Sequence, residues 1–240
     1  MTAGAPQTPH EALAALARRE DLRLSDEALG RLATWSELVR TVGARTNLVG
    51  TLDEQRVHEE LVIDSLQLLP LLAEAGAAAD EPRHLVDVGS GAGVPGLLLA
   101  ACLPGAATLI EPRMKRALFL RHAARQMGIG DRIAVHEARL EQCSDAQLHA
   151  GEARLFVSRA VFAPDEWRRR VAERAAPQDT IAVWRNAGPG SASATDRGAD
   201  DDTDDPAVGT WTLVGQRRYE VPGIGPRVVT LLRCERPPER

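Results

Sequence analysis

The segment His84-Leu-Val-Asp-Val-Gly-Ser-Gly-Ala-Gly-Val-Pro-Gly96 sets the architecture of this chain. It begins with a short apolar run bounded by glycine, which predicts a buried strand that runs into a tight turn. Gly89, Gly91 and Gly93 stand at every second position, where the backbone must turn sharply and a ligand must approach closely. The apolar residues 97–102 then begin a helix. Strand, glycine turn and helix together predict a nucleotide-type pocket at the helix N-terminus.

Two chemistries use such a turn. Residues 91–96 satisfy the dinucleotide fingerprint G-x-G-x-x-G, a lone match to which is weak evidence for NAD. Read from Asp87, the turn is D-x-G-x-G-x-G, which resembles motif I of class I S-adenosylmethionine (SAM) methyltransferases. Only the second interpretation explains Asp87, since a carboxylate in an apolar strand is costly without a partner. The resemblance implies that Asp87 lies near the methionine end of the cofactor.

A second acid supports a nucleotide-like cofactor. Residues 108–111, Thr-Leu-Ile-Glu, predict the next strand, with Glu111 at its end. Glu111 follows Gly91 by about 20 residues, the distance expected for an acid that binds a ribose diol. An ordinary solvated loop acid is the alternative for Glu111 alone. Together with the glycine turn, the ribose role is favoured.

Composition limits the classes of protein. The 240 residues are 44% hydrophobic, enough to bury one substantial core. The formal net charge of -5 and the pI near 5.7 argue mildly against nucleic-acid binding, although local patches can override the total. Cys102, Cys143 and Cys234 have no metal-like spacing, so we expect free thiols, no metal site and a reducing cytoplasm. We find neither a membrane-length apolar run nor a signal peptide in the sequence.

The rest of the chain alternates predicted strands with helices, which is typical of an α/β fold. We predict an N-terminal helical extension over residues 1–80 and a SAM-binding methyltransferase domain over 81–240. Residues 186–209 are rich in Gly, Ser, Ala and Asp and predict a mobile acidic loop. The further predicted helices are 10–19, 25–42, 56–70, 112–127 and 167–174, and the further predicted strands are 133–136, 155–161, 180–184 and an antiparallel pair at 211–215 and 227–233.

Three positions have both a functional and a structural interpretation. Arg159 follows an apolar strand, and ligands of open α/β sheets bind at the carboxyl ends of strands, so Arg159 is favoured as functional over an ordinary surface arginine. The basic helix 112–127 is either a solvated face or a phosphate contact. Asp64 is unfavoured in the middle of a helix and is interpreted as structural.

Motifs in order along the chain, from Leu32 to Leu232, resemble the bacterial small-subunit (16S) ribosomal RNA guanine-N7 methyltransferases of the glucose-inhibited division protein B type. The Pro-Gly end of the glycine segment is unusual among methyltransferases and matches this family's form of motif I. The other matches are Asn47-Leu48, Ile63-Asp-Ser-Leu66, Lys115-Arg116 with Phe119-Leu-Arg121, Arg139-Leu-Glu141, Ser158-Arg-Ala160 and Val221-Pro222.

The resemblance implies a class I SAM-dependent methyltransferase: a Rossmann-like mixed sheet with an antiparallel last strand, behind an N-terminal helical extension. It implies a cytoplasmic, monomeric enzyme that takes SAM as cofactor and ribosomal RNA or the small ribosomal subunit as partner. By position it places Asn47, Arg139 and Arg159 at the substrate end of the pocket. With the glycine-turn argument, the predicted cofactor-binding residues are Asp87, Gly89, Gly91, Gly93, Val94, Glu111, Leu140, Glu141 and Arg159.

The chain departs from the family pattern in its basic residues. A histidine and an arginine of the family are replaced by Leu61 and Glu60, a Lys-Gly pair is replaced by Trp184-Arg185, and the acidic segment near Asp200 is inserted. Lost basic groups and added acids weaken phosphate binding. A small molecule or another RNA as acceptor, a catalytically silent SAM-binding protein, and an NAD-dependent oxidoreductase therefore remain as alternatives.

Overall fold

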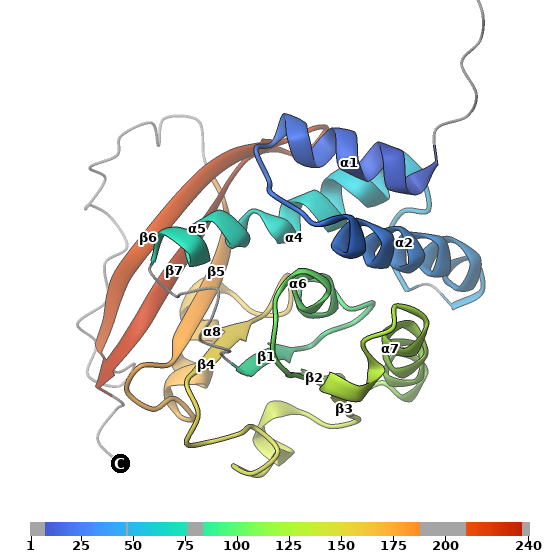
Figure 1. The fold of residues 1–240 in the computed structure, drawn as a ribbon. Helices are drawn as coiled ribbons and strands as arrows, with labels where there is room; N and C mark the ends of the chain where they lie inside the picture. The colour runs from blue at the N-terminus through green and yellow to red at the C-terminus, as the bar shows by residue number, and fades with distance from the viewer. Residues whose placement is uncertain (1–7, 47, 76–83, 188–209, 237–240) are drawn as a thin grey trace, which may run out of the picture.

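A seven-stranded mixed sheet forms the centre of the molecule (Figure 1). The structure, a computed structural model, describes residues 8–46, 48–75, 84–187 and 210–236. The strand order is β3-β2-β1-β4-β5-β7-β6; β1 to β5 pair in parallel, and β7 is antiparallel to both of its neighbours. The strands are β1 His84–Val88, β2 Ala107–Ile110, β3 Ile133–His136, β4 Arg154–Val157, β5 Thr180–Asn186, β6 Thr210–Val221 and β7 Gly225–Arg236.

This strand order confirms the predicted methyltransferase sheet and its antiparallel end. The dinucleotide-binding fold shares the order 3-2-1-4-5 but continues with a parallel sixth strand. Here β7 lies between β5 and β6, with Thr180 paired with Arg233. The NAD interpretation therefore loses its structural support.

Helices cover both faces of the sheet, and the first two begin at side-chain caps. Thr8 and Glu11 form a capping box at the first helix, and the Ser25 hydroxyl accepts the backbone N–H of Ala28 at 3.1 Å before the second. The α-helices are α1 Pro9–Arg19, α2 Asp26–Thr46, α3 Glu54–Arg56, α4 Asp64–Leu66, α5 Leu68–Glu74, α6 Gly96–Cys102, α7 Met114–Gln126 and α8 Pro164–Ala172. The π-helix is η1 Val57–Ile63, and the 3₁₀-helices are η2 Gly130–Arg132 and η3 Leu140–Gln142.

The predicted helix over residues 56–70 differs from the observed structure. It is interrupted by the π-helix η1 and continues to Glu74 in α5. Pro70 does not end it, because Pro70 stands in the first turn of α5, where its missing N–H has no intrahelical partner to lose. The observed boundary of this segment is therefore later than the predicted one.

Alternate residues of β1 face two different hydrophobic clusters. Leu85 packs into a cluster that includes residues of α1, α2, α5, α6 and α7, whereas Val86 and Val88 pack with Trp167 of α8. Figure 1 shows α1, α2, α4, α5 and α6 on the same side of the sheet. Trp35 of α2 is fully buried, as predicted, and its indole N–H donates to the Ala92 carbonyl at 2.8 Å. The N-terminal helix α2 thus contacts the glycine turn directly through this hydrogen bond.

The predicted division into residues 1–80 and 81–240 stays a prediction, since the described N-terminal helices and the sheet share one hydrophobic cluster. Most of the predicted acidic loop at 186–209 lies outside the described residues. Among the helices that the structure describes, none is both long and apolar enough to cross a bilayer.

Candidate functional site

The glycine turn directly follows β1 and leaves no room for side chains. Gly89 has a φ of +74°, and its N–H donates to the Ile110 carbonyl at 2.8 Å. A Cβ at Gly89 would lie 2.6 Å from a methyl of Val161, and one at Gly93 would lie 2.7 Å from Leu97. Positive φ and this close approach together explain why glycine is required at these positions.

Asp87 is a fully buried carboxylate whose hydrogen bonding is incomplete. Its Oδ2 accepts the backbone N–H of Gly96 at 3.1 Å, which ties β1 to the start of α6. A Cβ at Gly96 would lie only 2.3 Å from the Cβ of Asp87. Oδ1 of Asp87 is buried and, among the described residues, has no hydrogen-bond partner. Burial raises the pKa of Asp87 to about 7.

An orphaned carboxylate oxygen beside a glycine turn fits a cofactor that carries a positive charge and hydrogen-bond donors, since a buried acceptor without a partner is unfavourable. The methionine end of SAM carries both. The residues present are therefore compatible with SAM.

Glu111 is held rigidly at the tip of β2. Its Oε2 accepts the N–H of Gly91 and its Oε1 accepts the N–H of Arg113, each at 2.9 Å. Because each carboxylate oxygen has two acceptor sites, one on each oxygen remains for a ligand. This arrangement fits the predicted contact with a ribose diol.

A cavity of about 480 Å³ opens at the carboxyl ends of β1 and β2. Its volume lies in the range of small-molecule sites. It combines apolar walls with acidic and arginine side chains. The lining residues are Val88, Gly89, Ile110, Glu111, Pro112, Arg113, Arg116, Ala138, Arg139, Leu140, Glu141, Ala160, Val161, Phe162 and Arg170.

The cavity brings together five of the predicted site residues: Gly89, Glu111, Arg139, Leu140 and Glu141. Of these, Leu140 and Glu141 belong to η3, and the carboxylate of Glu141 forms an ion pair with Arg170. The described lining does not include Asp87, Gly91, Gly93, Val94 or Arg159. Asn47 lies outside the described residues.

Asp64 forms a second polar centre, between the N-terminal helices and the end of the sheet. Its Oδ2 accepts from Nη1 of Arg159 at 2.6 Å and from Nη1 of Arg227 at 3.0 Å, and its Oδ1 accepts the Tyr219 hydroxyl at 2.5 Å. Nη1 of Arg159 also donates to the Glu60 carbonyl at 3.1 Å, within the π-helix. We call Asp64, Arg159, Tyr219 and Arg227 the Asp64 cluster. The structural interpretation of Asp64 is thereby confirmed.

Burial shifts the pKa values of Arg159 and Tyr219 in the Asp64 cluster in opposite directions. It lowers the pKa of the Arg159 guanidinium, which Asp64 in turn raises. Burial and the nearby Asp64 carboxylate raise the pKa of Tyr219 well above its usual range, so the phenol keeps its proton. Sequence reasoning missed Tyr219 and Arg227, because both stand more than 150 residues after Asp64 and neither belongs to a recognised motif.

Comparisons of the sequence with protein families and with individual relatives point to the same family. A family model described as GidB, rRNA small subunit methyltransferase G, matches residues 29–187. Over 123 residues the chain is 37% identical to the ribosomal RNA small subunit methyltransferase G of Granulibacter bethesdensis, a match that covers 51% of this chain and 54% of that relative. Over 144 residues it is 35% identical to the protein of the same name from Sorangium cellulosum, covering 60% and 58%.

The matched part of the chain thus spans about half the length of these curated relatives. Among solved structures, the O-methyltransferase TomG from Streptomyces achromogenes, solved in complex with SAM, superimposes with a TM-score of 0.54 at 17% identity. That match covers 92% of this chain and 96% of the other. At this identity it shows a likeness of fold alone.

Proposed function

We propose that this chain, which belongs to the rRNA small subunit methyltransferase G family, transfers a methyl group from SAM to guanine N7 of small-subunit (16S) ribosomal RNA. The glycine turn supports this most strongly, because a cavity, the fixed Glu111 and the incompletely bonded Asp87 lie near it, at the carboxyl-end half of β1 and β2. The proposal includes a cytoplasmic, monomeric enzyme that needs no metal for the transfer.

The cofactor residues have separate roles in the proposal. The incompletely bonded carboxylate of Asp87 attracts the positively charged methionine end of SAM. Glu111 accepts hydrogen bonds from the ribose, and the apolar side chains of Ile110 and Leu140 contact the adenine. SAM supplies a methyl group that its sulfonium already activates.

Guanine N7 has a free lone pair, so the transfer needs no general base. The acids that line the described part of the cavity are engaged: Glu111 accepts two backbone N–H groups, and Glu141 pairs with Arg170. The remaining work is to position two reactants and exclude water, for which effective molarity supplies the rate enhancement.

Arg159 contributes to the substrate end through its rigid orientation. Its side chain is 12% exposed and is fixed by Asp64 and by the Glu60 carbonyl. It follows β4 by two residues and is one residue from Ala160, which lines the cavity. An arginine in that position orients a base or a flanking phosphate.

Cations at the mouth of the cavity suit the RNA backbone despite the negative net charge of the chain. Arg113, Lys115 and Arg139 are exposed, and both arginines line the cavity. Each phosphate that they contact adds salt-dependent affinity. We propose that these three side chains, together with Asn47, receive the RNA.

The test is methyl transfer from labelled SAM to 16S rRNA, offered as naked RNA and as 30S subunits, followed by mapping of the modified base. The proposal expects one 7-methylguanine that is absent from the control without protein. If SAM binds but neither substrate gains this methyl group, 16S rRNA is not the methyl acceptor. The alternative acceptors are then a small molecule or another RNA. If SAM binds and none of the tested acceptors is methylated, the result supports the alternative that the chain is a catalytically silent SAM-binding protein.

A further inference from the structure

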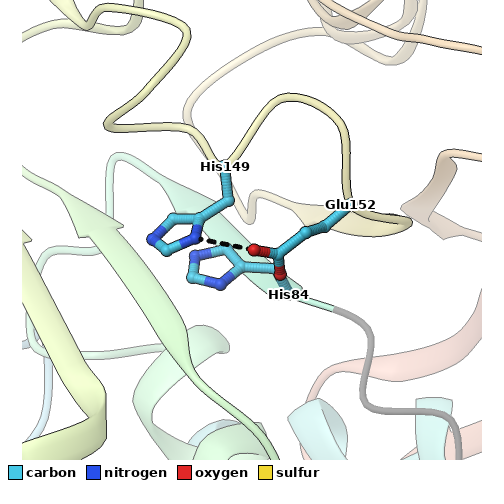
Figure 2. Close-up of side chains that lie close together, drawn as sticks. All are labelled: His84, His149 and Glu152. Carbon is cyan, nitrogen blue, oxygen red and sulfur yellow. Dashed lines mark hydrogen bonds and ion pairs between the residues drawn. The ribbon is translucent and has the colours of Figure 1, made fainter.

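A second cluster of chemically reactive side chains lies at the opposite end of β1 from the glycine turn. His84 begins β1, and His149 and Glu152 belong to the segment before β4 (Figure 2). Each of the three offers one ligand atom, and these atoms lie within 4.8 Å of one another. Gly89 is five positions after His84 along the strand, a distance of about 16 Å. The cluster is therefore separate from the cofactor cavity.

Hydrogen bonds around Thr108 favour one tautomer of His84. The Thr108 hydroxyl lies 3.3 Å from the Gln147 carbonyl, to which it can only donate. In that arrangement the hydroxyl accepts from Nε2 of His84, which lies 2.8 Å away. Nε2 of His84 then carries the proton, and Nδ1 keeps its lone pair.

This arrangement resembles the support of a metal-binding histidine, whose second ring nitrogen donates to a fixed acceptor.

The other two side chains are accessible and close to each other. Nδ1 of His149 lies 3.3 Å from Oε1 of Glu152, and their side chains are 38% and 61% exposed. The rings of His84 and His149 are stacked, with centroids 3.7 Å apart and planes at 17°. An imidazole binds a metal in its ring plane, so His149 has to turn as the ion enters, and its exposure allows this rotation.

We propose that His84, His149 and Glu152 form a binding site for a zinc ion, with water completing the coordination. Two imidazole nitrogens and one carboxylate are a ligand set that zinc accepts. None of these three ligands is a cysteine. The prediction of no metal site rested on cysteine spacing and therefore did not bear on these residues. His84 and His149 are 65 positions apart in the sequence, so no local pattern reveals the site.

The ion would tie the segment that follows η3 to the first strand of the sheet. His149 has a positive φ of +52°, which is unfavourable for a residue with a side chain. A metal bond offsets part of that cost and stabilises the segment that leads back to Leu140 and Glu141. The role is structural, and it does not depend on the proposed methyl transfer.

The site is tested by calorimetric titration of Zn²⁺ into the untagged, chelator-treated chain, with thermal unfolding as a second readout. We expect one ion per chain and a higher Tm with zinc. His149→Ala and Glu152→Gln change exposed side chains, so both should fold, lose this binding event and show no zinc-dependent rise in Tm. His122→Ala, at an exposed histidine of α7, is the matched control and should bind as the wild type does.

Thr108→Val probes the tautomer argument, because it removes the acceptor for Nε2 of His84 without touching a ligand. We expect about 10–100-fold weaker zinc binding in this variant. The site is disproved if the wild type binds no ion at one per chain. Equal affinity in the wild type, His149→Ala and Glu152→Gln disproves it as well, because the zinc then binds elsewhere.

Discussion

Two fully buried aspartates, Asp64 and Asp87, differ in how completely the protein satisfies their carboxylates. The carboxylate of Asp64 accepts hydrogen bonds from Arg159, Tyr219 and Arg227, so both of its oxygens are engaged. That of Asp87 accepts one backbone N–H and leaves its other oxygen without a described partner. The hydrogen bonding of Asp64 is therefore saturated by the protein itself, whereas that of Asp87 leaves an acceptor for the cofactor that we propose.

Asp64→Ala should give the largest effect on stability. It leaves the guanidinium groups of Arg159 and Arg227 buried without their carboxylate. Breaking a buried ion pair in this way costs about 3–5 kcal/mol. Urea unfolding of the variant and the wild type measures the difference in the free energy of unfolding.

Asp145→Ala is the matched control for that substitution. Asp145 pairs with Arg174 at 3.3 Å on the surface, with 75% of its side chain exposed. Exposed pairs contribute about 0–1 kcal/mol. If Asp64→Ala and Asp145→Ala lost the same free energy of unfolding, the buried ion pairs of Asp64 would contribute no more than an exposed surface ion pair. That result would contradict the account.

Tyr219→Phe tests one contact of the Asp64 cluster without leaving a cation unpaired. It removes the hydroxyl that donates to Asp64 at 2.5 Å and keeps the ring. Hydrogen bonds to charged groups contribute about 1.5–3 kcal/mol, so a loss of that size is expected in urea unfolding. No loss would show that Asp64 does not need its third donor.

Asp87→Asn should change the pH dependence of SAM binding. Burial raises the pKa of Asp87 to about 7, so the carboxylate gains its charge as the pH rises through neutrality. An anion attracts the cationic methionine end, so SAM affinity should rise between about pH 6 and pH 8, by up to about tenfold. The Asn variant should bind more weakly at pH 8 and show no such rise.

The same titration has a consequence for the free protein. The folded pKa of Asp87 lies above the unfolded value of 3.8, so the folded state holds its proton more tightly. The contribution of Asp87 to stability is therefore present at low pH and is lost as the pH rises toward 7. Urea unfolding at several pH values should show this decline in the wild type and a smaller one in Asp87→Asn.

Arg170→Ala should have the smallest effect on stability. Arg170 pairs with Glu141 and Glu166, and its own side chain is 37% exposed. The expected loss is below about 1 kcal/mol in urea unfolding. A loss comparable to that of Asp64→Ala would mean that the rim of the cofactor cavity is as tightly built as the Asp64 cluster.

Local patterns predicted the cofactor half of the molecule well. The apolar run of β1, the alternating glycines and Glu111 belong to segments whose geometry depends on neighbours in sequence. The structure brings Gly89, Glu111, Arg139, Leu140 and Glu141 together at one cavity, although their roles in binding remain predictions. The mixed sheet with its antiparallel last strand was also predicted, from the alternation of strands and helices together with the family resemblance.

The Asp64 cluster was far less accessible to sequence reasoning. Asp64 was marked by an unfavoured position within a helix and by the match at residues 63–66, neither of which indicates its partners Tyr219 and Arg227 in the last two strands. The π-helix η1 has no recognisable pattern, and it was predicted as ordinary helix. Contacts across more than 150 residues are fixed by the packing of N-terminal helices on the sheet, which no local pattern encodes.

The central claim is that SAM binds at the glycine turn that follows β1. Its most direct test is calorimetric titration of SAM into the wild type, Gly89→Ala and Gly128→Ala. Both glycines have a positive φ, but a Cβ at Gly89 would press on Val161 at the cavity, whereas one at Gly128 would meet nothing within 4 Å. The account predicts that SAM binds to the wild type and to Gly128→Ala and fails to bind to Gly89→Ala. Unchanged SAM affinity in Gly89→Ala would contradict it.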